Sequence, residues 1–440
     1  MFNKCQFIFD ILESSGYECY AVGGCVRDML LGITPHDMDF TTNATPDEIL
    51  SCFKEYKTFE LGKKFGTISV VKDNNIYEIT TYRIDGKYSD SRHPDSVKFS
   101  SDLKDDLSRR DFTINAMAMD KNGKITDIFG GREDLQNKII RTVGNPQARF
   151  SEDALRILRA LRFSAKLGFN IDKETSEAFK AMKESLKEVH PQRLRDELYS
   201  LMISEHCADI LSEYKDVLVV IISELKVMFD YNQNNIHHCY NLFSHTTEAI
   251  KLSPSIPEIR FALLFHDIGK PACQTTDNNG VFHFYGHPAK SAEITSSALK
   301  RFGFSSEFID KICNIIRYHD TRFKNPTTQI KRMLTKISED DFKNLITVMR
   351  CDVLAQSDYM RSEKLNNIDL IETEFNKIII VKPCIKLSDL AVNGFDLQTL
   401  GLTGKSIGDT LNQLLDLVIE DKLGNNKSEL IEYVKSNPHH

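Results

Sequence analysis

The pattern of hydrophobic and polar residues changes along the chain, and the change falls near residue 143. Up to residue 142, short runs with strand-like patterning alternate with helical segments. Strands are predicted at ISVV (68–71), IYEITTYR (76–83) and KITDIF (124–129), and helices at PDEILSCFKEY (46–56) and in the segment from Val26. From Gly144 to about residue 375, nearly every segment has helical periodicity. The pattern therefore predicts an α+β protein, in which a small mixed head is followed by helical domains.

Four segments stand out from this general pattern. The N-terminus predicts an amphipathic helix with hydrophobic residues on one side, namely Phe2, Phe7, Ile8, Ile11 and Leu12. The run VLVVIISEL (217–225) predicts a buried helix. The polar segment 85–103 contains Gly, Ser and Pro and predicts a long mobile loop, and loops of that length are usually functional or disordered. The segment 381–397 predicts a linker before a short helical tail.

Composition narrows the class of protein. The chain is 41% hydrophobic and 27% charged, which is typical of a soluble globular protein, and no apolar run approaches the roughly 20 residues that span a bilayer. The N-terminus also lacks the pattern of a secretory signal. Ten scattered cysteines without a C-x-x-C pair indicate a reducing cytoplasm, with no zinc knuckle or disulfide framework. The net charge of −7 shows no overall basic balance, although nucleic-acid binding needs only a local cationic groove.

The stretch GGCVRDMLLGITPHDMDF (23–40) carries the first candidate chemistry. If DMDF is a strand, the carboxylates of Asp37 and Asp39 lie on the same face and repel each other unless a cation lies between them. Mg²⁺ in phosphoryl transfer is typically held by one or two carboxylates and the substrate phosphates. The amides of Gly23 and Gly24 can approach a phosphate closely, and Arg27 can grip one. D-x-D alone would more often be two solvated aspartates, but the complete string favours a metal pair with a phosphate site.

Five motifs, in order, resemble those of one family. The string 23–40 resembles the signature of class II tRNA nucleotidyltransferases and bacterial poly(A) polymerases, within the DNA polymerase beta superfamily. RRDFTINAMA (109–118), DIFGGREDL (127–135), EDALRILRALRF (152–163) and HPQRLRDEL (190–198) resemble the next four motifs. The resemblance covers about residues 20 to 200, and it implies a polymerase-beta-like head followed by an all-helical neck, body and tail.

The resemblance implies a role for several residues of the head. By similarity, Asp37 and Asp39 hold the catalytic Mg²⁺ ions. Gly24 and Arg27 contact the incoming nucleotide, and Arg110 contacts its triphosphate or ribose. Asp111 orients the sugar or contributes electrostatically. Glu78 is either a further carboxylate at the metal site or an ordinary strand residue.

In the fourth motif, Asp153, Arg156, Arg159 and Arg162 recur at three-residue intervals on one predicted helix. On an arbitrary helix they would form a solvated charged face, but here apolar residues occupy the opposite side, so the arginines should face the nucleotide domain. In the family, the Asp and the first Arg pair with the edge of the incoming base. This implies that Asp153 and Arg156 select C and A without a nucleic-acid template.

The segment FELGKKFGTISV (59–70) indicates a branch of the family. It resembles the G-x-x-F-G-T segment of CCA-adding enzymes rather than the Arg-rich counterpart of poly(A) polymerases. Similar enzymes that add only CC lack much of the loop at 85–103, so the resemblance implies addition of CCA rather than CC alone. We therefore expect C, C and A to be added to the 3′ end of tRNA from CTP and ATP. Addition of CC or A alone and poly(A) synthesis remain alternatives.

A second group of candidate ligands lies between about 235 and 355. The order H…HD…D of the HD phosphohydrolase signature is met by His245, His266, Asp267 and Asp352, with Gly269 and Pro271 predicted to end the helix before them. Imidazole and carboxylate ligands suit a divalent transition metal that activates water, and His287 and His319 could add a second metal. This predicts a secondary phosphohydrolase or phosphodiesterase activity, although some HD domains of the family only act as scaffolds.

These observations predict four domains: a nucleotidyltransferase head (1–142), a base-recognising neck (143–205), an HD domain (206–378) and a tail (379–440) that contacts tRNA. The expected partners are tRNA, CTP and ATP, with no membrane partner, and the oligomeric state stays open. The rival hypothesis from another class is an HD phosphohydrolase whose head only binds RNA or nucleotide. The intact D-x-D, Arg27 and the pair Asp153/Arg156 argue against it.

Overall fold

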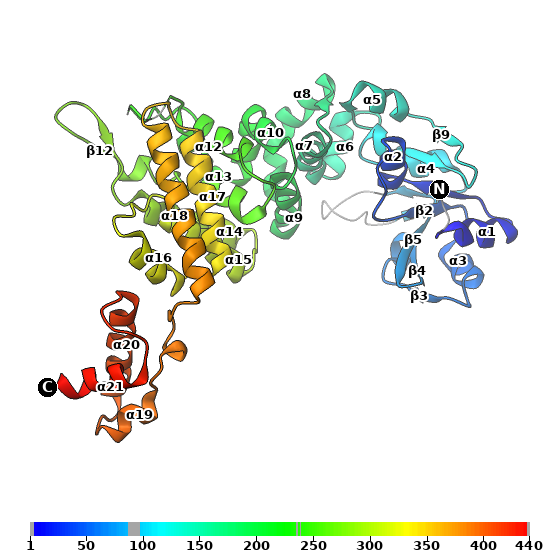
Figure 1. Cartoon of the computed structure of the whole chain (residues 1–440). Coiled ribbons are helices and arrows are strands. Elements are labelled where there is room, and N and C mark those ends of the chain that lie inside the picture. The colour runs from blue at the N-terminus through cyan, green and yellow to red at the C-terminus, as the bar shows by residue number, and fades with distance from the viewer. Residues whose placement is uncertain (1–3, 87–96, 235, 238, 438–440) are drawn as a thin grey trace. The chain divides into compact units, whose positions relative to one another are not determined.

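The structure is a computed structural model, and it describes residues 4–86, 97–234, 236–237 and 239–437 (Figure 1). By its internal contacts, the chain divides into unit 1 (1–223) and unit 2 (224–440), which we describe separately. Most of the predicted loop 85–103 falls outside the described residues. Its last part was wrongly predicted, because β7 (Val97–Phe99) pairs with β6 (Arg83–Asp85) and the alternating residues Val-Lys-Phe suit an edge strand.

Unit 1 begins with a seven-stranded sheet in the order β3-β4-β5-β2-β1-β8-β9. Its strands are β1 (Cys19–Val22), β2 (Asp39–Thr42), β3 (Lys57–Phe59), β4 (Thr67–Lys72), β5 (Asn75–Thr81), β8 (Met117–Met119) and β9 (Ile125–Asp127). Neighbouring strands are antiparallel except β2 and β5, which are parallel. Strands β4, β5 and β9 confirm the three strand predictions.

The two faces of this sheet have different coverings because side chains alternate along each strand. On one face, Phe40 of β2 packs edge-on against Phe9 of α1 (Gln6–Ser14), with ring centroids 5.4 Å apart. On the other face, Val22 of β1 packs with Leu107 of α4 (Leu103–Ser108). Asp39 is in register with Val22 and with Glu78 of β5, so its carboxylate lies on the second face.

Helices make up most of the rest of unit 1. The head contributes α2 (Gly24–Leu30), α3 (Pro46–Cys52) and α5 (Gly131–Asn137), and helices α6 (Pro146–Glu152), α7 (Leu155–Leu167), α8 (Lys173–Met182), α9 (Pro191–Met202), α10 (Cys207–Glu213) and α11 (Lys215–Ile221) follow. The prediction of one continuous helix through the fourth motif is wrong. Asp153 has extended backbone angles (φ −148°, ψ 104°) and separates α6 from α7, so its side chain is directed independently of the α7 arginines.

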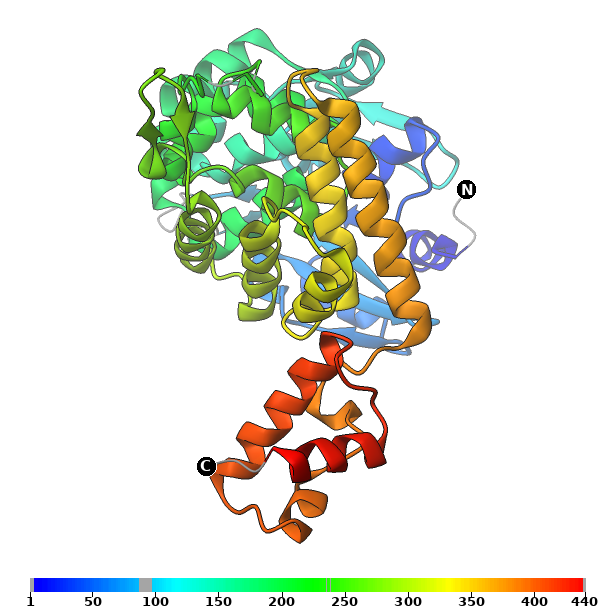
Figure 2. The ribbon, with the colours of Figure 1, turned by 60° about the vertical axis from the view of Figure 1, so that its left-hand side comes forward.

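Unit 2 is almost entirely helical. It contains α12 (Leu242–Lys251), α13 (Pro257–Phe265), α14 (His287–Arg301), α15 (Ser306–Tyr318), α16 (Pro326–Leu334), α17 (Glu339–Leu354), α18 (Arg361–Val381), α19 (Gly394–Thr399), α20 (Lys405–Ile419) and α21 (Lys427–Ser436). Figure 2 shows α17 and α18 side by side, joined by a short connection. The predicted linker 381–397 is in part a piece of the tail, because Leu390 and Val392 are buried in the same cluster as Leu414 and Leu430.

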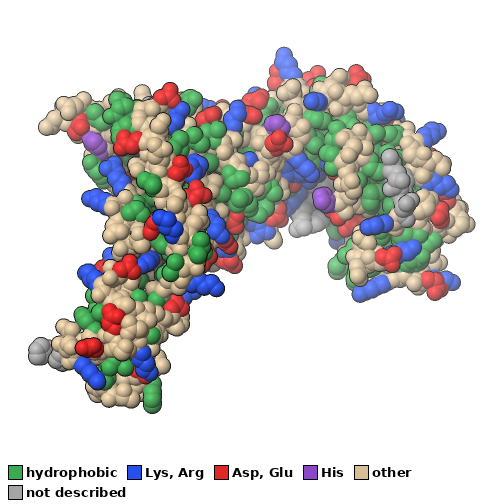
Figure 3. All heavy atoms as spheres, in the orientation of Figure 1, with side chains coloured by type: hydrophobic (Ala, Val, Ile, Leu, Met, Phe, Trp, Pro, Cys, Tyr) green, Lys and Arg blue, Asp and Glu red, His purple; other side chains and the backbone are tan. Residues whose placement is uncertain are grey.

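The outside of the molecule carries both signs of charge. On the face drawn in Figure 3, basic and acidic side chains are interspersed, in keeping with a formal net charge of −7. Among the described helices, none has both the length and the apolar character that crossing a bilayer requires.

Candidate active sites

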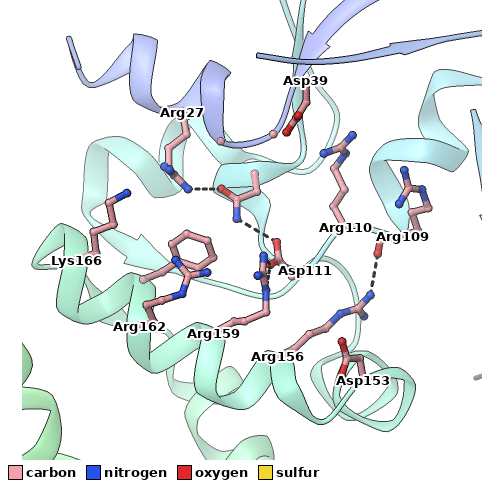
Figure 4. A pocket seen from close by; sticks show the side chains of 14 residues that line it. Arg27, Asp39, Arg109, Arg110, Asp111, Asp153, Arg156, Arg159, Arg162 and Lys166 are labelled. Atoms are coloured by element: carbon pink, nitrogen blue, oxygen red, sulfur yellow. Dashed lines mark hydrogen bonds and ion pairs between the residues drawn. The ribbon is translucent and has the colours of Figure 1, made fainter. Parts of the chain in front are cut away.

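Unit 1 contains a cavity of about 420 Å³ in which most of the residues predicted to bind nucleotide meet (Figure 4). The start of α2, the first residue of β2, the segment after α4, and the junction of α6 with α7 form its walls. The predicted residues that line it are Gly24, Arg27, Asp39, Arg110, Asp111, Asp153, Arg156, Arg159 and Arg162. Asp37 and Glu78 are not among the lining residues. Residues from four separate stretches of sequence are thus brought together by the fold.

The carboxylates at the edge of this cavity repel one another. Asp39 is the first residue of β2, and Asp37 lies in the preceding loop, so only one of the two predicted aspartates is on the strand. Removal from bulk water raises the pKa of Asp39, and the neighbouring carboxylates of Glu78 and Asp37 raise it further, against the lowering effect of Arg110. A divalent cation would relieve this repulsion, and oxygen ligands suit Mg²⁺, so the residues present fit that ion.

Gly23 and Arg27 shape the part of the cavity wall beside Asp39. Gly23 precedes α2 with φ +79°, a backbone angle that favours glycine, and a Cβ atom there would lie 3.0 Å from Nη1 of Arg110, which would have to shift slightly. The buried Arg27 side chain donates from Nη1 to Oδ1 of Asn115 at 2.7 Å and from Nη2 to Oδ1 of Asp28, also at 2.7 Å. Its guanidinium lies 5.1 Å from the ring centroid of Phe163. Arg27 is therefore held in one position before any ligand binds.

Asp111 joins the head to helix α7. Its Oδ2 accepts from Nε and Nη2 of Arg159 at 2.9 and 2.6 Å, and its Oδ1 accepts from Nδ2 of Asn115 at 3.0 Å. Burial alone would raise the pKa of Asp111, but the charge of Arg159 and these hydrogen bonds hold it well below its usual range. Arg159 also reaches Glu197 of α9 through Nη1 at 3.3 Å. In this structure, the carboxylate that was predicted to orient the sugar is engaged by protein groups.

Asp153 and Arg156 line the same cavity but do not pair with each other. The Asp153 carboxylate accepts two hydrogen bonds from Arg193 of α9, at 3.2 and 2.7 Å. Arg156 donates to Oε2 of Glu152 at 2.6 Å and to the backbone oxygen of Arg109 at 3.0 Å, and it is 7% exposed. Each group is therefore positioned by its own partner, and a base edge could be offered a carboxylate and a guanidinium together.

Sequence reasoning missed several residues of this site. Asn115 holds Arg27, Phe163 underlies the arginines, Arg193 holds Asp153, and Lys166 lines the cavity. Asn115, Phe163 and Arg193 each lie inside one of the five motifs. Their position in these motifs was the only sequence feature that could have marked them as site residues. Lys166 lies outside the motifs, and it lines the cavity because of the direction in which helix α7 runs.

Unit 2 brings together the second predicted set of ligands. His245 of α12, His266 and Asp267 just after α13, and Asp352 of α17 place one ligand atom each within 4.8 Å of one another. A second group, formed by Asp267, His287 and His319, shares Asp267 with the first. The shortest contact joins Nε2 of His245 to Oδ1 of Asp352 at 2.9 Å, and Nε2 of His287 lies 3.3 Å from Nε2 of His319.

The protonation of these four histidines is set by backbone carbonyl groups. A carbonyl oxygen can only accept a hydrogen bond, so each Nδ1 must carry the proton. These Nδ1 contacts are His245 to Ala355 (3.2 Å), His266 to Leu263 (2.8 Å), His287 to Phe284 (2.8 Å) and His319 to Ile316 (2.7 Å). In a neutral ring, each Nε2 then has a lone pair, and these lone pairs converge in a buried space.

The convergent lone pairs and carboxylates fit a metal ion. Within the described residues, Nε2 of His266 is buried without a well-directed hydrogen bond. Burial would lower the pKa of His266, but Asp267 and Asp352 raise it to about 10, which shows that the site attracts positive charge. Imidazole nitrogens and carboxylate oxygens suit Zn²⁺, Mn²⁺, Fe²⁺ or Ni²⁺. The predicted ligand set therefore stands as one cluster, with the second group beside it.

Gly269 has a different role from the predicted one. Helix α13 ends at Phe265, four residues before this glycine, so Gly269 does not end it. A Cβ atom at Gly269 would lie 2.7 Å from the backbone nitrogen of Ser291, and the amide of Gly269 donates to Oγ of Ser291 at 2.9 Å. The glycine allows the His266-Asp267 turn to approach α14, which carries His287.

Comparison with known proteins places the chain in a family. Residues 19–141 match the model of the poly A polymerase head domain, and residues 285–434 match that of tRNA nucleotidyltransferase domain 2. A curated CCA-adding enzyme of Lactobacillus helveticus is 32% identical over 436 residues, which cover 99% of this chain and 97% of that protein. The chain belongs to the family of CCA-adding enzymes.

Other CCA-adding enzymes agree in sequence and in fold. A relative from Oceanobacillus iheyensis is 47% identical over 216 residues, which span about half of each protein (49% and 54%). The crystal structure of the Bacillus stearothermophilus CCA-adding enzyme in complex with CTP matches 99% of this chain and 98% of its own, at 27% identity and a TM-score of 0.73. The expected α+β fold, with a sheet-containing head and a helical remainder, is confirmed. The four domain boundaries remain predictions.

Proposed function

We propose that this CCA-adding family member extends the 3′ end of tRNA by C, C and A, using CTP and ATP. The observation that carries the proposal is the cavity of unit 1, where Asp39, Arg27, Arg110, Asp153 and Arg156 face one space. The solved relative that binds CTP supports the proposal, as does the curated CCA-adding enzyme that this chain matches over nearly its whole length.

Different side chains around the cavity hold the metal ions and bind the triphosphate. Asp37 and Asp39 would hold Mg²⁺, with Glu78 beside Asp39 as a further carboxylate. When bound, Mg²⁺ favours attack by the tRNA 3′ hydroxyl on the α-phosphate and loss of pyrophosphate. Arg27 and Arg110 bind the triphosphate, and the backbone at Gly23 and Gly24 allows it to approach closely. Because Asn115 and Phe163 hold Arg27 before binding, little side-chain freedom is lost when the nucleotide enters.

The bases are selected by protein groups. The carboxylate of Asp153 accepts from an exocyclic amino group, and the guanidinium of Arg156 donates to a ring nitrogen, which both C and A offer. Arg193 keeps the carboxylate in position, and Glu152 keeps the guanidinium in position. Arg159 and Arg162 extend the cationic wall along α7.

Product sequencing tests this proposal most directly. A tRNA that lacks its CCA end is incubated with CTP alone, ATP alone or both nucleotides, and the extended ends are sequenced. We expect CC with CTP alone and CCA with both. A product that stops at CC with both nucleotides, or a long run of A, would replace the proposal by one of the alternative specificities.

We also propose a secondary metal-dependent phosphohydrolase activity for unit 2. It is supported by the convergence of His245, His266, Asp267 and Asp352, and by the carbonyl groups that direct each Nε2 inward. When bound, a divalent transition metal supplies a water nucleophile at neutral pH. The buried carboxylates and imidazoles hold the ion, and Lys270 donates to Asp267 at 2.6 Å.

Replacement of two ligands tests this second activity. His266→Ala with Asp267→Ala should abolish metal-dependent hydrolysis of p-nitrophenyl phosphate and of bis(p-nitrophenyl) phosphate. Asp352→Asn, which keeps the side-chain volume, should lower it strongly without unfolding the unit. Undiminished hydrolysis in both variants would assign the activity to another site.

A further inference from the structure

The connection between α17 and α18 places a lysine beside the metal ligands of unit 2. The amide of Gln356 donates to both oxygens of Asp352 at 3.2 Å, and its Oε1 accepts from Nζ of Lys364 at 2.6 Å. Lys364 also donates to Nδ1 of His237 at 3.1 Å. A continuous series of hydrogen bonds therefore runs from a candidate metal ligand to a half-buried ammonium group.

The charge of Lys364 is not neutralised by a contact with a carboxylate. In the described part of the chain, no Asp or Glu oxygen comes within 4.0 Å of its Nζ, and both of its hydrogen-bond acceptors are neutral. The nearby Lys270 differs, because its ammonium is 2.6 Å from Oδ2 of Asp267 and 2.9 Å from Oε1 of Gln233. The two lysines therefore differ, because Lys270 pairs directly with a metal ligand, whereas Lys364 reaches Asp352 only through Gln356.

The charges of the cluster indicate which ester it suits. When one divalent ion is bound, the two carboxylates of Asp267 and Asp352 balance its charge, and the imidazoles that hold it are neutral because a protonated nitrogen cannot be a ligand. The two lysines then leave two positive charges, and a second metal ion would add to them. A phosphate monoester carries close to two negative charges at pH 7, whereas a diester carries one. The excess of positive charge therefore matches the monoester.

We propose that Lys364, positioned by Gln356 and His237, binds the phosphate of the substrate of unit 2, and that this substrate is a phosphate monoester. The inference rests on the proposed phosphohydrolase function and names its substrate class. Lys364 donates to a non-bridging oxygen, and Gln356 keeps the ammonium and Asp352 at a fixed separation. Water attacks phosphorus, the ester oxygen leaves as the alcohol after taking up a proton, and inorganic phosphate is released.

The test uses the full chain loaded with Mn²⁺ and three variants: Lys364→Met, Lys364→Arg and the control Lys377→Met. Lys377 lies on the same helix and is exposed, and within the described residues it forms an ion pair only with Glu374. The readouts are Mn²⁺ affinity, the Kd for inorganic phosphate, and KM and kcat for p-nitrophenyl phosphate and bis(p-nitrophenyl) phosphate.

We expect Lys364→Met to weaken phosphate binding about tenfold to a hundredfold and to raise KM for the monoester similarly, because one charge-assisted hydrogen bond is lost. Mn²⁺ affinity and the KM of the diester should change little, Lys364→Arg should restore part of the effect, and Lys377→Met should match the wild type. Unchanged phosphate affinity in Lys364→Met, a loss of Mn²⁺ binding in that variant, or a wild-type preference for the diester would overturn the inference. If the wild type neither binds Mn²⁺ nor hydrolyses either ester, the proposed second function fails first, and this inference fails with it.

Discussion

Asp39 is a residue whose surroundings oppose its charge. Removal from bulk water and the carboxylates of Glu78 and Asp37 raise its pKa, so the folded protein binds its proton more tightly than the unfolded chain does. Stability is therefore lost as the pH rises from the ordinary value of 3.8 through the raised one. The repulsion destabilises the folded protein, but it results from placing the carboxylates together where a cation would bind.

This predicts that Asp39→Asn slightly raises the melting temperature at pH 7 in the absence of divalent ions. Mg²⁺ should raise the melting temperature of the wild type more than that of the variant, because the ion relieves the same repulsion. Asp73→Asn serves as the control, since Asp73 is exposed on the turn between β4 and β5 at φ 51°, an angle that asparagine tolerates. The measurement is thermal unfolding by circular dichroism with and without Mg²⁺. A clear fall in the melting temperature of Asp39→Asn would show that the carboxylate stabilises the fold.

Asp153 and Arg156 set the choice of base in this account. Asp153→Ala should relax selection, so that incorporation of U or G rises relative to C and A by about tenfold or more, because one hydrogen-bonding partner of the base is lost. Arg193→Ala should have a weaker effect in the same direction, since it removes the group that holds Asp153. The assay compares kcat/KM for the four nucleoside triphosphates, with Lys173→Met on the exposed side of α8 as the control. Unaltered ratios in Asp153→Ala would assign base selection elsewhere.

At the scale of elements, contacts between the head and helix α7 hold the first site together. Asp111 accepts from Arg159 of α7 and from Asn115, and Asn115 in turn accepts from Arg27 of α2. These residues connect the wall that we propose to hold the phosphates with the helix that we propose to face the base. The same contacts therefore serve both the stability of unit 1 and the geometry of the cavity.

Asp111→Asn should lower the free energy of unfolding of unit 1 by about 3 kcal/mol, because it leaves the Arg159 charge without its main partner. The lowered pKa of Asp111 also predicts a pH effect. Its stabilisation is complete above the ordinary value of 3.8 and is lost as the pH falls towards the lower folded value, so the variant and wild type should converge in strong acid. Urea unfolding from pH 7 down to pH 2 measures the difference at neutral pH and its decrease below pH 3.8. Equal stability of the two proteins at pH 7 would contradict the role given to this carboxylate.

Sequence patterns predicted which elements exist better than where they begin. The strands β4, β5 and β9 follow from their alternating residues, but β2 begins at Asp39, so Asp37 lies in the loop. Helical periodicity continued through Asp153, although the side chain of Arg193, far away in sequence, holds that residue in an extended break. A contact between residues far apart in sequence does not appear in the pattern of hydrophobic and polar residues. The partners that position the site, such as Asn115 and Arg193, were hidden for the same reason.

At the scale of the whole molecule, the two sites are built from separate parts of the chain. Every lining residue of the first cavity lies in unit 1, and all six residues of the second cluster lie in unit 2. The order of the histidines and aspartates predicted the second cluster, but Gln356 and Lys364 were missed, because only the turn between α17 and α18 brings them to Asp352. Because the two sites share no residue, we expect the activity of each site to be independent of the other.

We therefore expect His266→Ala with Asp267→Ala to leave CCA addition within about twofold of the wild type. Asp37→Asn with Asp39→Asn should likewise leave phosphate-ester hydrolysis unchanged. Both activities are measured on the same purified preparations, with circular dichroism to confirm folding. Loss of both activities in either variant would show that the sites depend on each other.

The central claim is that Asp37 and Asp39 hold the ions that allow an RNA end to be lengthened. Its most direct test is extension of a tRNA lacking CCA by the Asp37→Asn, Asp39→Asn variant, followed on a sequencing gel with labelled CTP and ATP. The account predicts a loss of at least about a thousandfold in rate with the fold intact. Extension at the wild-type rate by a correctly folded variant would contradict it.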